Sequence, residues 1–262
     1  MERKWLYGAI GIVAIAIVVW MGYNLYLQTT YPTITTIKNK AVFVIGTSAD
    51  FPPFEYVNET GAIVGLDIDI ANEIAKELGV KLEIKDLGFA SLITALENKQ
   101  IDSILAGMTI TAERQQKVDF SKPYFNASQA VISLAGKSIG SLTGKKIGVQ
   151  VGTTGEWWVA DNLIANGTIP EDNVIHYDKW PAAILALQKG DVDVLLLDEP
   201  VGKMFVKKIS GLQYNFAIDT GEQYGIAVNK ESKDLLELVN KVISNLQTSG
   251  KYESIVEKWF GS

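Results

Sequence analysis

Cysteine is absent from the 262-residue chain, and His176 is its only histidine. These absences exclude disulfide bonds, thiolate zinc sites, cysteine nucleophiles and metal sites built from several histidines. A Ser-His-Asp triad has only His176 available. Acidic side chains number 30 against 24 basic ones, with no cluster of Lys and Arg, which argues against a nucleic-acid partner. We therefore expect no metal, no cofactor and no hydrolytic catalysis.

Charge is also absent near the N-terminus, where no Asp, Glu, Lys or Arg occurs between Trp5 and Ile37. The 23 residues from Trp5 to Leu27 would measure roughly 34 Å as a helix, enough to cross a bilayer. Arg3 and Lys4 precede this segment, so the positive-inside rule places the N-terminus in the cytoplasm and the rest of the chain outside. The sequence predicts one N-terminal transmembrane helix.

A cleaved signal peptide is the alternative for this segment. It would require a small-residue cleavage site after the apolar run, and residues 21–26 supply none. We therefore predict an uncleaved membrane anchor over residues 1–28 and a Thr-rich tether over residues 29–38.

Apolar runs rich in β-branched residues alternate with helical patterns beyond the tether, which is typical of an α/β domain. The predicted strands are residues 41–46, 81–85 and 101–106, and the predicted helices are residues 67–78 and 90–98.

Two segments of the chain resemble each other. Residues 89–107 align with residues 180–198 without gaps, with five identical positions among nineteen. If the similarity reflects two equivalent units, Gly107 and Asp198 end equivalent strands. In open α/β sheets ligands bind beyond the carboxyl ends of strands, so both residues would face one cleft. The alternative is that any two helix–turn–strand units share this pattern.

Arg114 lies in an unusual place for a cation. Thr111 is the expected N-cap of a helix that begins at Ala112, so Arg114 occupies the third helical position, where a capping box favours Glu or Gln and the helix dipole disfavours positive charge. A guanidinium beside the Thr109 hydroxyl suits a bidentate carboxylate clamp. The alternative is a solvated surface arginine.

Asp198 follows the apolar run Val194–Leu197 and precedes Glu199 and Pro200. A carboxylate at the end of a buried strand is costly unless it is paired, and a ligand ammonium would pair it. The alternative is an N-cap for the helix after Pro200, and both roles are compatible.

The turn Gly152–Gly155 joins a predicted strand to a helix. Backbone N–H groups and hydroxyls at such a helix start favour an anion, and this turn lacks the lysine of a phosphate-binding loop, which favours a carboxylate. An ordinary N-cap by Thr153 or Thr154 is the alternative. Phe51 and Phe89 add aromatic surface near the strand ends, whereas Phe54 is expected in the core. Together these groups describe a pocket for a zwitterion, with its carboxylate at Arg114 and its ammonium at Asp198.

Several strings resemble the polar amino-acid substrate-binding proteins of ABC importers. They are GTSADFPPFEY (46–56), GLDIDIANEIAKELG (65–79), ILAGMTITAERQQKVDFSKPYF (104–125), GKKIGVQVGTTGE (144–156), QYGIAV (223–228) and GKYESIVEKWFG (250–261). The resemblance spans almost all of residues 39–262. It implies a type II periplasmic-binding-protein fold with two α/β lobes, lobe 1 over residues 39–128 and 220–262 and lobe 2 over residues 129–219.

The resemblance also implies a set of ligand-binding residues. The carboxylate clamp falls on Arg114, Thr109 and Thr154 with the backbone of Gly107, the ammonium partner on Asp198, and the aromatic plates on Phe51 and Phe89. Ser48 and Gln150 stand where relatives carry acidic or basic side chains. The two hinge strands fall near residues 124–128 and 220–224.

The expected function is capture of a polar L-amino acid outside the cytoplasm and its delivery to a membrane permease driven by an ATPase. The neutral pair Ser48 and Gln150 slightly favours glutamine, whereas Asp50 leaves arginine or lysine open. An enzyme that dehydrates cyclic carboxylic acids on the same fold is a rival, with Glu156 or Asp50 as its acid. We expect a binding protein, because a carboxylate clamp together with an ammonium partner serves a zwitterion.

Overall fold

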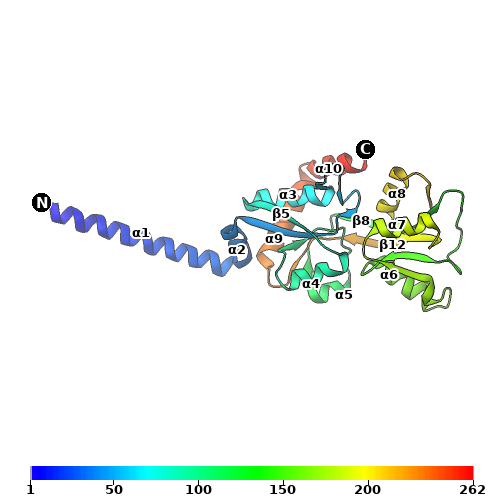
Figure 1. The fold of residues 1–262 in the computed structure, drawn as a ribbon. Helices are drawn as coiled ribbons and strands as arrows, with labels where there is room; N and C mark the ends of the chain where they lie inside the picture. The colour runs from blue at the N-terminus through cyan, green and yellow to red at the C-terminus, as the bar shows by residue number, and fades with distance from the viewer. Residues whose placement is uncertain (1, 262) are drawn as a thin grey trace.

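The computed structural model describes the backbone of residues 2–261 and the side chains of residue 13 and residues 15–261. The chain begins with a long helix, α1 (Glu2–Thr30), that projects away from a body of two lobes (Figure 1). Its large apolar side chains at Val13 and between Ile15 and Tyr26 are exposed.

Within the part of the chain that is described, no helix combines the length and the apolar character that a membrane span needs. The predicted transmembrane helix is therefore not confirmed. Much of it, residues 5–12 and residue 14, has side chains outside the described ones.

The segment predicted as a tether is mostly helical. Helix α2 (Pro32–Lys40) begins with proline at its first position and packs against α9 (Lys233–Thr248). Its Ile37 is fully buried, and the backbone N–H of Ile34 donates to Asp234 Oδ2 at 2.9 Å. Residues 32–40 are thus part of the first lobe's packing.

The first lobe is built on a five-stranded sheet in the order β5-β1-β6-β13-β7. Strand β1 runs parallel to β5 and β6, and β13 runs antiparallel to β6 and β7. Helix α3 covers one face and helices α4 and α5 lie toward the other (Figure 1). The strands are β1 (Val42–Thr47), β5 (Lys81–Asp86), β6 (Ser103–Ile104), β7 (Val118–Phe120) and β13 (Ala227–Asn229), with a small sheet of β2 (Asp50–Phe51), β3 (Glu55–Val57) and β4 (Ile63–Val64); the helices are α3 (Leu66–Leu78), η1 (Phe89–Ser91), α4 (Leu92–Glu97), α5 (Ala112–Lys117), α9 and α10 (Lys251–Phe260).

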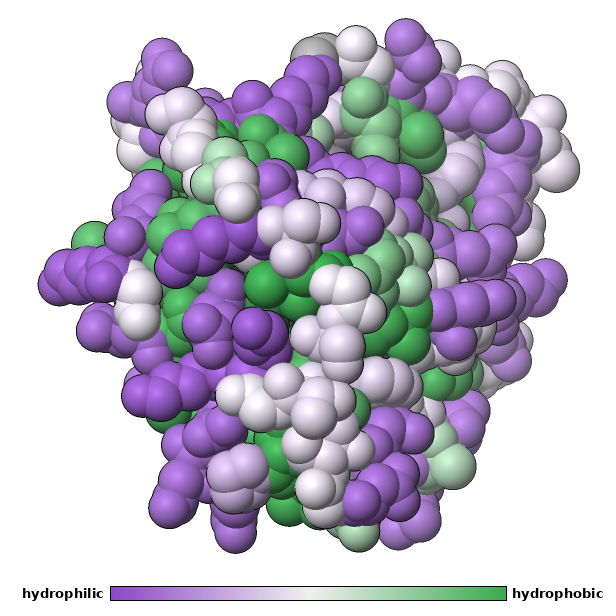
Figure 2. Space-filling model, turned by 90° about the vertical axis from the view of Figure 1, so that its right-hand side faces the viewer, coloured by the Kyte–Doolittle hydropathy of each residue, from purple (hydrophilic) through white to green (hydrophobic). Residues whose placement is uncertain are grey.

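The second lobe repeats this plan with a sheet in the order β10-β9-β11-β8-β12. Its end of the molecule presents a mostly hydrophilic surface in which apolar side chains are scattered (Figure 2). The strands are β8 (Phe125–Leu134), β9 (Ile147–Gln150), β10 (Val174–Tyr177), β11 (Val194–Asp198) and β12 (Leu212–Tyr224); the helices are α6 (Thr154–Val159), η2 (Ala160–Ile164), η3 (Glu171–Asn173), α7 (Trp180–Lys189) and α8 (Glu199–Lys208).

Two long antiparallel strands, β8 and β12, connect the lobes (Figure 1). Their ends next to the first lobe pair Phe125 with Tyr224 and Ala127 with Glu222. The α/β class and the two-lobe fold are therefore confirmed. The exact lobe boundaries at residues 128/129 and 219/220 stay predictions.

An aromatic cluster fastens the first lobe to both connecting strands. Phe54 is fully buried, as predicted, and its ring centroid lies 4.9 Å from that of Phe125, 5.1 Å from that of Tyr224 and 5.6 Å from that of Phe260. These rings come from β8, β12 and the C-terminal helix, so one side chain joins three distant parts of the sequence.

Phe54→Ala should lower the free energy of unfolding by about 3–5 kcal/mol, because it removes a fully buried ring and leaves a cavity at this junction. Urea unfolding followed by circular dichroism measures the change. Val57→Ala is the control, since Val57 lies on the neighbouring strand but is 50% exposed. Equal effects of the two substitutions would contradict the assigned role of Phe54.

Candidate functional site

A small cavity lies between the lobes, and all nine residues predicted for the site line it. The lining residues are Ser48, Phe51, Glu55, Phe89, Gly107, Thr109, Arg114, Gln150, Thr153, Thr154 and Asp198. Ser48, Gln150 and Asp198 lie at the carboxyl ends of β1, β9 and β11, where the rule for open α/β sheets places ligand-binding groups. The other lining residues come from the segment after β6 (Gly107, Thr109), from η1, α5 and the start of α6 (Phe89, Arg114, Thr153, Thr154) and from the small strands β2 and β3 (Phe51, Glu55). Glu55 and Thr153 were not among the predicted ligand-binding residues.

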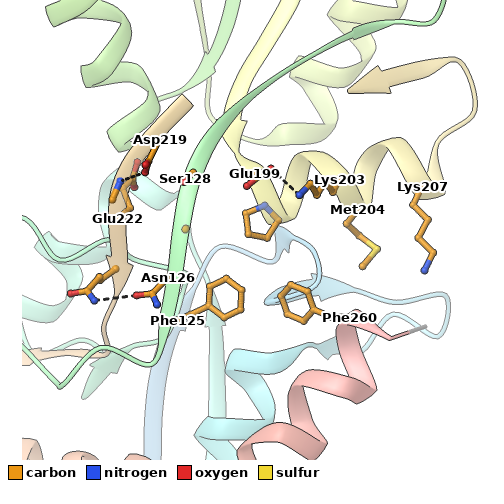
Figure 3. Close-up of a pocket in the computed structure, with 14 residues that line it drawn as sticks. Phe125, Asn126, Ser128, Glu199, Lys203, Met204, Lys207, Asp219, Glu222 and Phe260 are labelled. Atoms are coloured by element: carbon orange, nitrogen blue, oxygen red, sulfur yellow. Dashed lines mark hydrogen bonds and ion pairs between the residues drawn. The ribbon is translucent and has the colours of Figure 1, made fainter. Parts of the chain in front are cut away.

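The cavity has a volume of only about 10 Å³, close to the room that one water molecule needs. In this arrangement the cavity has no room for a molecule much larger than water. A larger groove of about 590 Å³ lies against strands β8 and β12, between α8 and Phe260 (Figure 3), but it contains none of the predicted residues.

Arg114 is buried and joins the two lobes. Thr111 caps helix α5 as predicted, accepting from the Arg114 N–H at 3.2 Å. The guanidinium donates to the carbonyl of Thr109 at 2.7 Å and to that of Gly152, in the other lobe, at 2.9 Å. Burial lowers the pKa of Arg114 to about 10, so the side chain stays cationic at neutral pH. The solvated-surface alternative is wrong.

Two aromatic rings enclose this guanidinium. Its central carbon lies 5.3 Å from the ring centroid of Phe89 and 5.0 Å from that of Trp157. Such cation–π contacts hold the planar group in one orientation. Phe89 therefore contacts Arg114, and its predicted role as a plate for the ligand stays a prediction.

Asp198 is buried at the end of β11. Its Oδ1 accepts from Gln129 Nε2 at 3.2 Å, and its Oδ2 accepts a very short hydrogen bond from the Tyr224 hydroxyl. Burial, together with the charge of Glu222, raises the pKa of Asp198 from 3.8 to about 7. The carboxylate makes no capping bond to helix α8, so the N-cap alternative does not describe its side chain.

Glu222, on β12, is a buried carboxylate that the sequence reasoning missed. Its Oε2 accepts from the hydroxyls of Thr109 at 2.6 Å and Thr154 at 2.7 Å. Its Oε1 accepts from Gln129 Nε2 at 2.9 Å and from Thr220 Oγ1 at 2.8 Å. The two hydroxyls predicted to clamp a ligand carboxylate thus already bind a carboxylate of the protein. No pattern in the sequence marked Glu222 beyond its place within the predicted hinge segment, residues 220–224.

Thr153 and Thr154 were the two candidates for the N-cap of α6, and Thr154 was also predicted to contact a ligand carboxylate. Thr153 is the N-cap of α6, since its hydroxyl accepts from the Glu156 N–H at 3.2 Å. Thr154, the first residue of the helix, directs its hydroxyl to Glu222. Its predicted contact with a ligand carboxylate stays a prediction.

Ser48 and Gln150 both donate to Asp50. The Ser48 hydroxyl lies 2.8 Å from Asp50 Oδ1, and Gln150 Nε2 lies 3.4 Å from Asp50 Oδ2. Asp50 itself is buried and does not line the cavity. The two neutral side chains that favoured glutamine, Ser48 and Gln150, are therefore both hydrogen-bonded to a buried carboxyl group.

Glu55 is the most exceptional group in the cavity. It is fully buried, and neither carboxylate oxygen has a hydrogen-bond partner. Burial and the nearby Asp67 raise its pKa well above the usual range. Asp67, equally buried, accepts from the Gly107 N–H and the Tyr124 hydroxyl, both at 2.8 Å, and burial raises its pKa to about 6. Glu55 accepts no hydrogen bond, and its raised pKa favours the neutral acid beside Asp67. A cation placed next to it would instead favour the ionised carboxylate.

The two lobes, their paired connecting strands and a polar cavity at the carboxyl ends of strands in both sheets define a two-lobe binding protein. Residues 43–262 match the family described as bacterial extracellular solute-binding proteins, family 3, and the chain belongs to this family.

Relatives with known names support this assignment. The L-cystine-binding protein TcyJ of Escherichia coli (strain K12) is 30% identical over 96% of this chain and 94% of its own length. The arginine-binding periplasmic protein of Mannheimia haemolytica is 34% identical over 90% of this chain and 97% of its own length. A mutant of the arginine-binding protein from T. maritima is 43% identical and superimposes with a TM-score of 0.83, covering 88% of this chain and 100% of that one.

Asp198→Asn should stabilise the protein more at pH 8 than at pH 5. The raised pKa means that the folded state holds a proton between pH 3.8 and about 7 that the unfolded chain has released, so the wild-type contribution is lost as pH rises through this window. We expect the stability difference between variant and wild type to grow by about 2 kcal/mol over this range. Urea unfolding at both pH values measures it.

Glu97→Gln, an exposed change of the same kind on α4, is the control and should show no such growth. A pH-independent effect of Asp198→Asn would contradict the raised pKa.

Proposed function

We propose that this protein is the extracytoplasmic binding component of an ABC importer and captures a cationic L-amino acid, with L-arginine the preferred ligand. The observation that carries this choice is Glu55, a carboxylate without donors in the cavity that also contains Arg114 and Asp198. Burial favours the neutral acid of Glu55 in this structure, and a bound cation would pair with and stabilise its ionised form. The proposal concerns residues 32–261 and makes no use of a membrane anchor.

The balance of charge in and around the cavity supports a cation. Arg114 is the single basic side chain among the lining residues, against the carboxyl groups of Glu55 and Asp198, with Glu222 directly behind. A ligand with two positive groups and one carboxylate fits this excess. Its carboxylate would bind Arg114, its ammonium Asp198 and its guanidinium Glu55.

Several relatives are named as arginine-binding proteins, whereas TcyJ is an L-cystine-binding protein. Besides the proteins above, an ancestral arginine-binding protein bound to arginine is 42% identical, with a TM-score of 0.79 over 84% of this chain. An ancestral arginine-binding protein has also been solved with glutamine bound. Glutamine, which the sequence slightly favoured, is therefore the informative competitor, although nothing specifically supports it as the ligand of this chain.

Binding would proceed by closure of the lobes. In the open form the ligand would meet Arg114, Phe51 and Glu55 of the first lobe, and rotation about β8 and β12 would then bring Thr154 and Asp198 against it. The ligand favours closure because it contacts both lobes only in the closed form. Its carboxylate must share or displace the hydroxyl bonds that Glu222 accepts, since each hydroxyl has one proton.

Dehydration of a cyclic carboxylic acid has less support. Glu156 accepts from the Gly152 N–H at 2.6 Å and pairs with His176 at 3.0 Å, outside the cavity. Asp50 is bonded to Ser48 and to the start of α7. Neither group proposed as the acid faces the cavity, and the matched relatives are binding proteins.

Titration of the full chain with amino acids by calorimetry tests the proposal. We expect L-arginine to bind most tightly, L-lysine less tightly and L-glutamine more weakly still. No heat with any polar or basic L-amino acid would contradict the function, and tighter binding of glutamine than of arginine would contradict the role of Glu55.

Glu55→Gln tests separately how this residue affects ligand binding and how it affects the free energy of unfolding. The substitution should weaken arginine binding by at least about 30-fold, because it leaves the ligand's buried cation unpaired. It should also raise the free energy of unfolding by about 1 kcal/mol, since it removes a buried carboxyl without donors. Calorimetry and urea unfolding measure the two effects. Glu59→Gln, an exposed change of the same kind, should alter neither.

A further inference from the structure

Beyond the cavity, the lobes are joined by Lys179, which lies between β10 and α7 in the second lobe. Its Nζ lies 2.6 Å from Asp86 Oδ1, 3.2 Å from Ser48 Oγ and 3.7 Å from Asp50 Oδ1, all in the first lobe. Lys179, Asp86 and Asp50 do not line the binding cavity. Of the four residues in this contact only Ser48 lines the cavity, so Lys179 and the two carboxylates join the lobes beside the cavity and not within it.

Asp50 makes a second bond between the lobes, at the start of helix α7. Asp50 Oδ2 accepts from the backbone N–H of Trp180, the first residue of α7, at 2.6 Å. The α7 N-cap residue, Lys179, makes no side-chain capping bond of its own. A carboxylate of the first lobe thus caps a helix of the second, where charge-assisted bonding and the helix dipole both favour it. Because Trp180 is fully buried, the capped end is rigid.

We propose that Lys179, Asp50 and Asp86 form a latch that stabilises the closed arrangement of the lobes independently of ligand, and that these positioning residues set affinity without contacting the amino acid. The predicted effect of the latch on affinity rests on the proposed binding function, whereas its predicted effect on closure does not. The bonds of Arg114 and Glu222 also join the lobes, yet those groups lie at the cavity and must rearrange when a ligand carboxylate enters. The latch remains intact in the presence of ligand.

The latch has a specific thermodynamic consequence. The apparent affinity of a ligand scales with the fraction of protein in the binding-competent arrangement. Weakening the latch lowers this fraction before any ligand is present, so it weakens binding of every ligand by the same factor. Selectivity between ligands is unchanged, in contrast to a substitution in the cavity.

The experiment measures closure directly. Because the chain contains no cysteine, Gln116→Cys and Asn166→Cys place a fluorescent donor and acceptor specifically. Both positions are exposed, one on α5 of the first lobe and one after η2 in the second. Lys179→Met removes the charge and keeps the aliphatic stem. Lys99→Met is the matched control, since Lys99 pairs at 2.7 Å with Glu231 within the first lobe.

Lys179→Met should lower energy transfer in the full chain without ligand, and 0.5 M salt should lower transfer in the wild type but not in this variant. The dissociation constants for arginine and lysine should both rise about fivefold, with their ratio unchanged. Lys99→Met should match the wild type. Asp86→Asn should reproduce the Lys179→Met effect, and the double variant should be no weaker than either single one.

Unchanged energy transfer in both Lys179→Met and Asp86→Asn would overturn the latch. A change in the ratio of arginine to lysine affinity would also overturn it, because Lys179 would then act on the ligand itself. If neither the wild type nor any variant binds an amino acid, the proposed function is wrong. Energy transfer without ligand still tests the latch in that case.

Discussion

Buried carboxylates are the constraint on which the closed structure depends. Asp50, Glu55, Asp67, Asp198 and Glu222 are all buried near the cleft, and each needs donors or a cation to offset its lost hydration. The donors come from distant parts of the chain. The hydrogen bonds to these carboxylates hold the two lobes and the cavity between them in one arrangement.

Four of the five carboxylates accept hydrogen bonds from other groups of the protein, and one does not. Asp67 is bound within the first lobe by Gly107 and Tyr124, whereas Glu222 is bound from both lobes. Glu55 alone receives no hydrogen bond. Under the proposed function, Glu55 is the group that pairs with the cation of the ligand.

The bonds between the lobes are of two kinds with different consequences. Under the proposed function, Arg114 and the hydroxyls bound by Glu222 would also bind the ligand, so their bonds between the lobes compete with binding or are shared with it. Under the proposed latch, Asp50 and Lys179 act on closure from outside the cavity lining, although both also bond to Ser48, which lines it. Affinity in such a protein depends on both the contacts with the ligand and the free energy of closing the lobes, and these quantities are set here by separate residues.

Sequence patterns were sufficient for the α/β class and for several strands and helices, because period and capping are local properties. Thr111 caps α5 as its position predicts, and Phe54 lies in the core. Local patterns were less reliable where a segment's partners are distant. Residues 29–38 read as a tether, yet much of this segment forms a helix packed on α9.

Nine of the eleven residues that line the cavity were also predicted from the chain alone, since chemistry at strand ends and family resemblance agree on Arg114, Asp198 and their neighbours. Only the tertiary structure decided how these groups are bonded. It showed Glu55 without donors, Glu222 on the clamp hydroxyls and Asp50 on a helix of the other lobe, because hydrogen bonds between residues 68 to 130 positions apart leave no periodic trace in sequence.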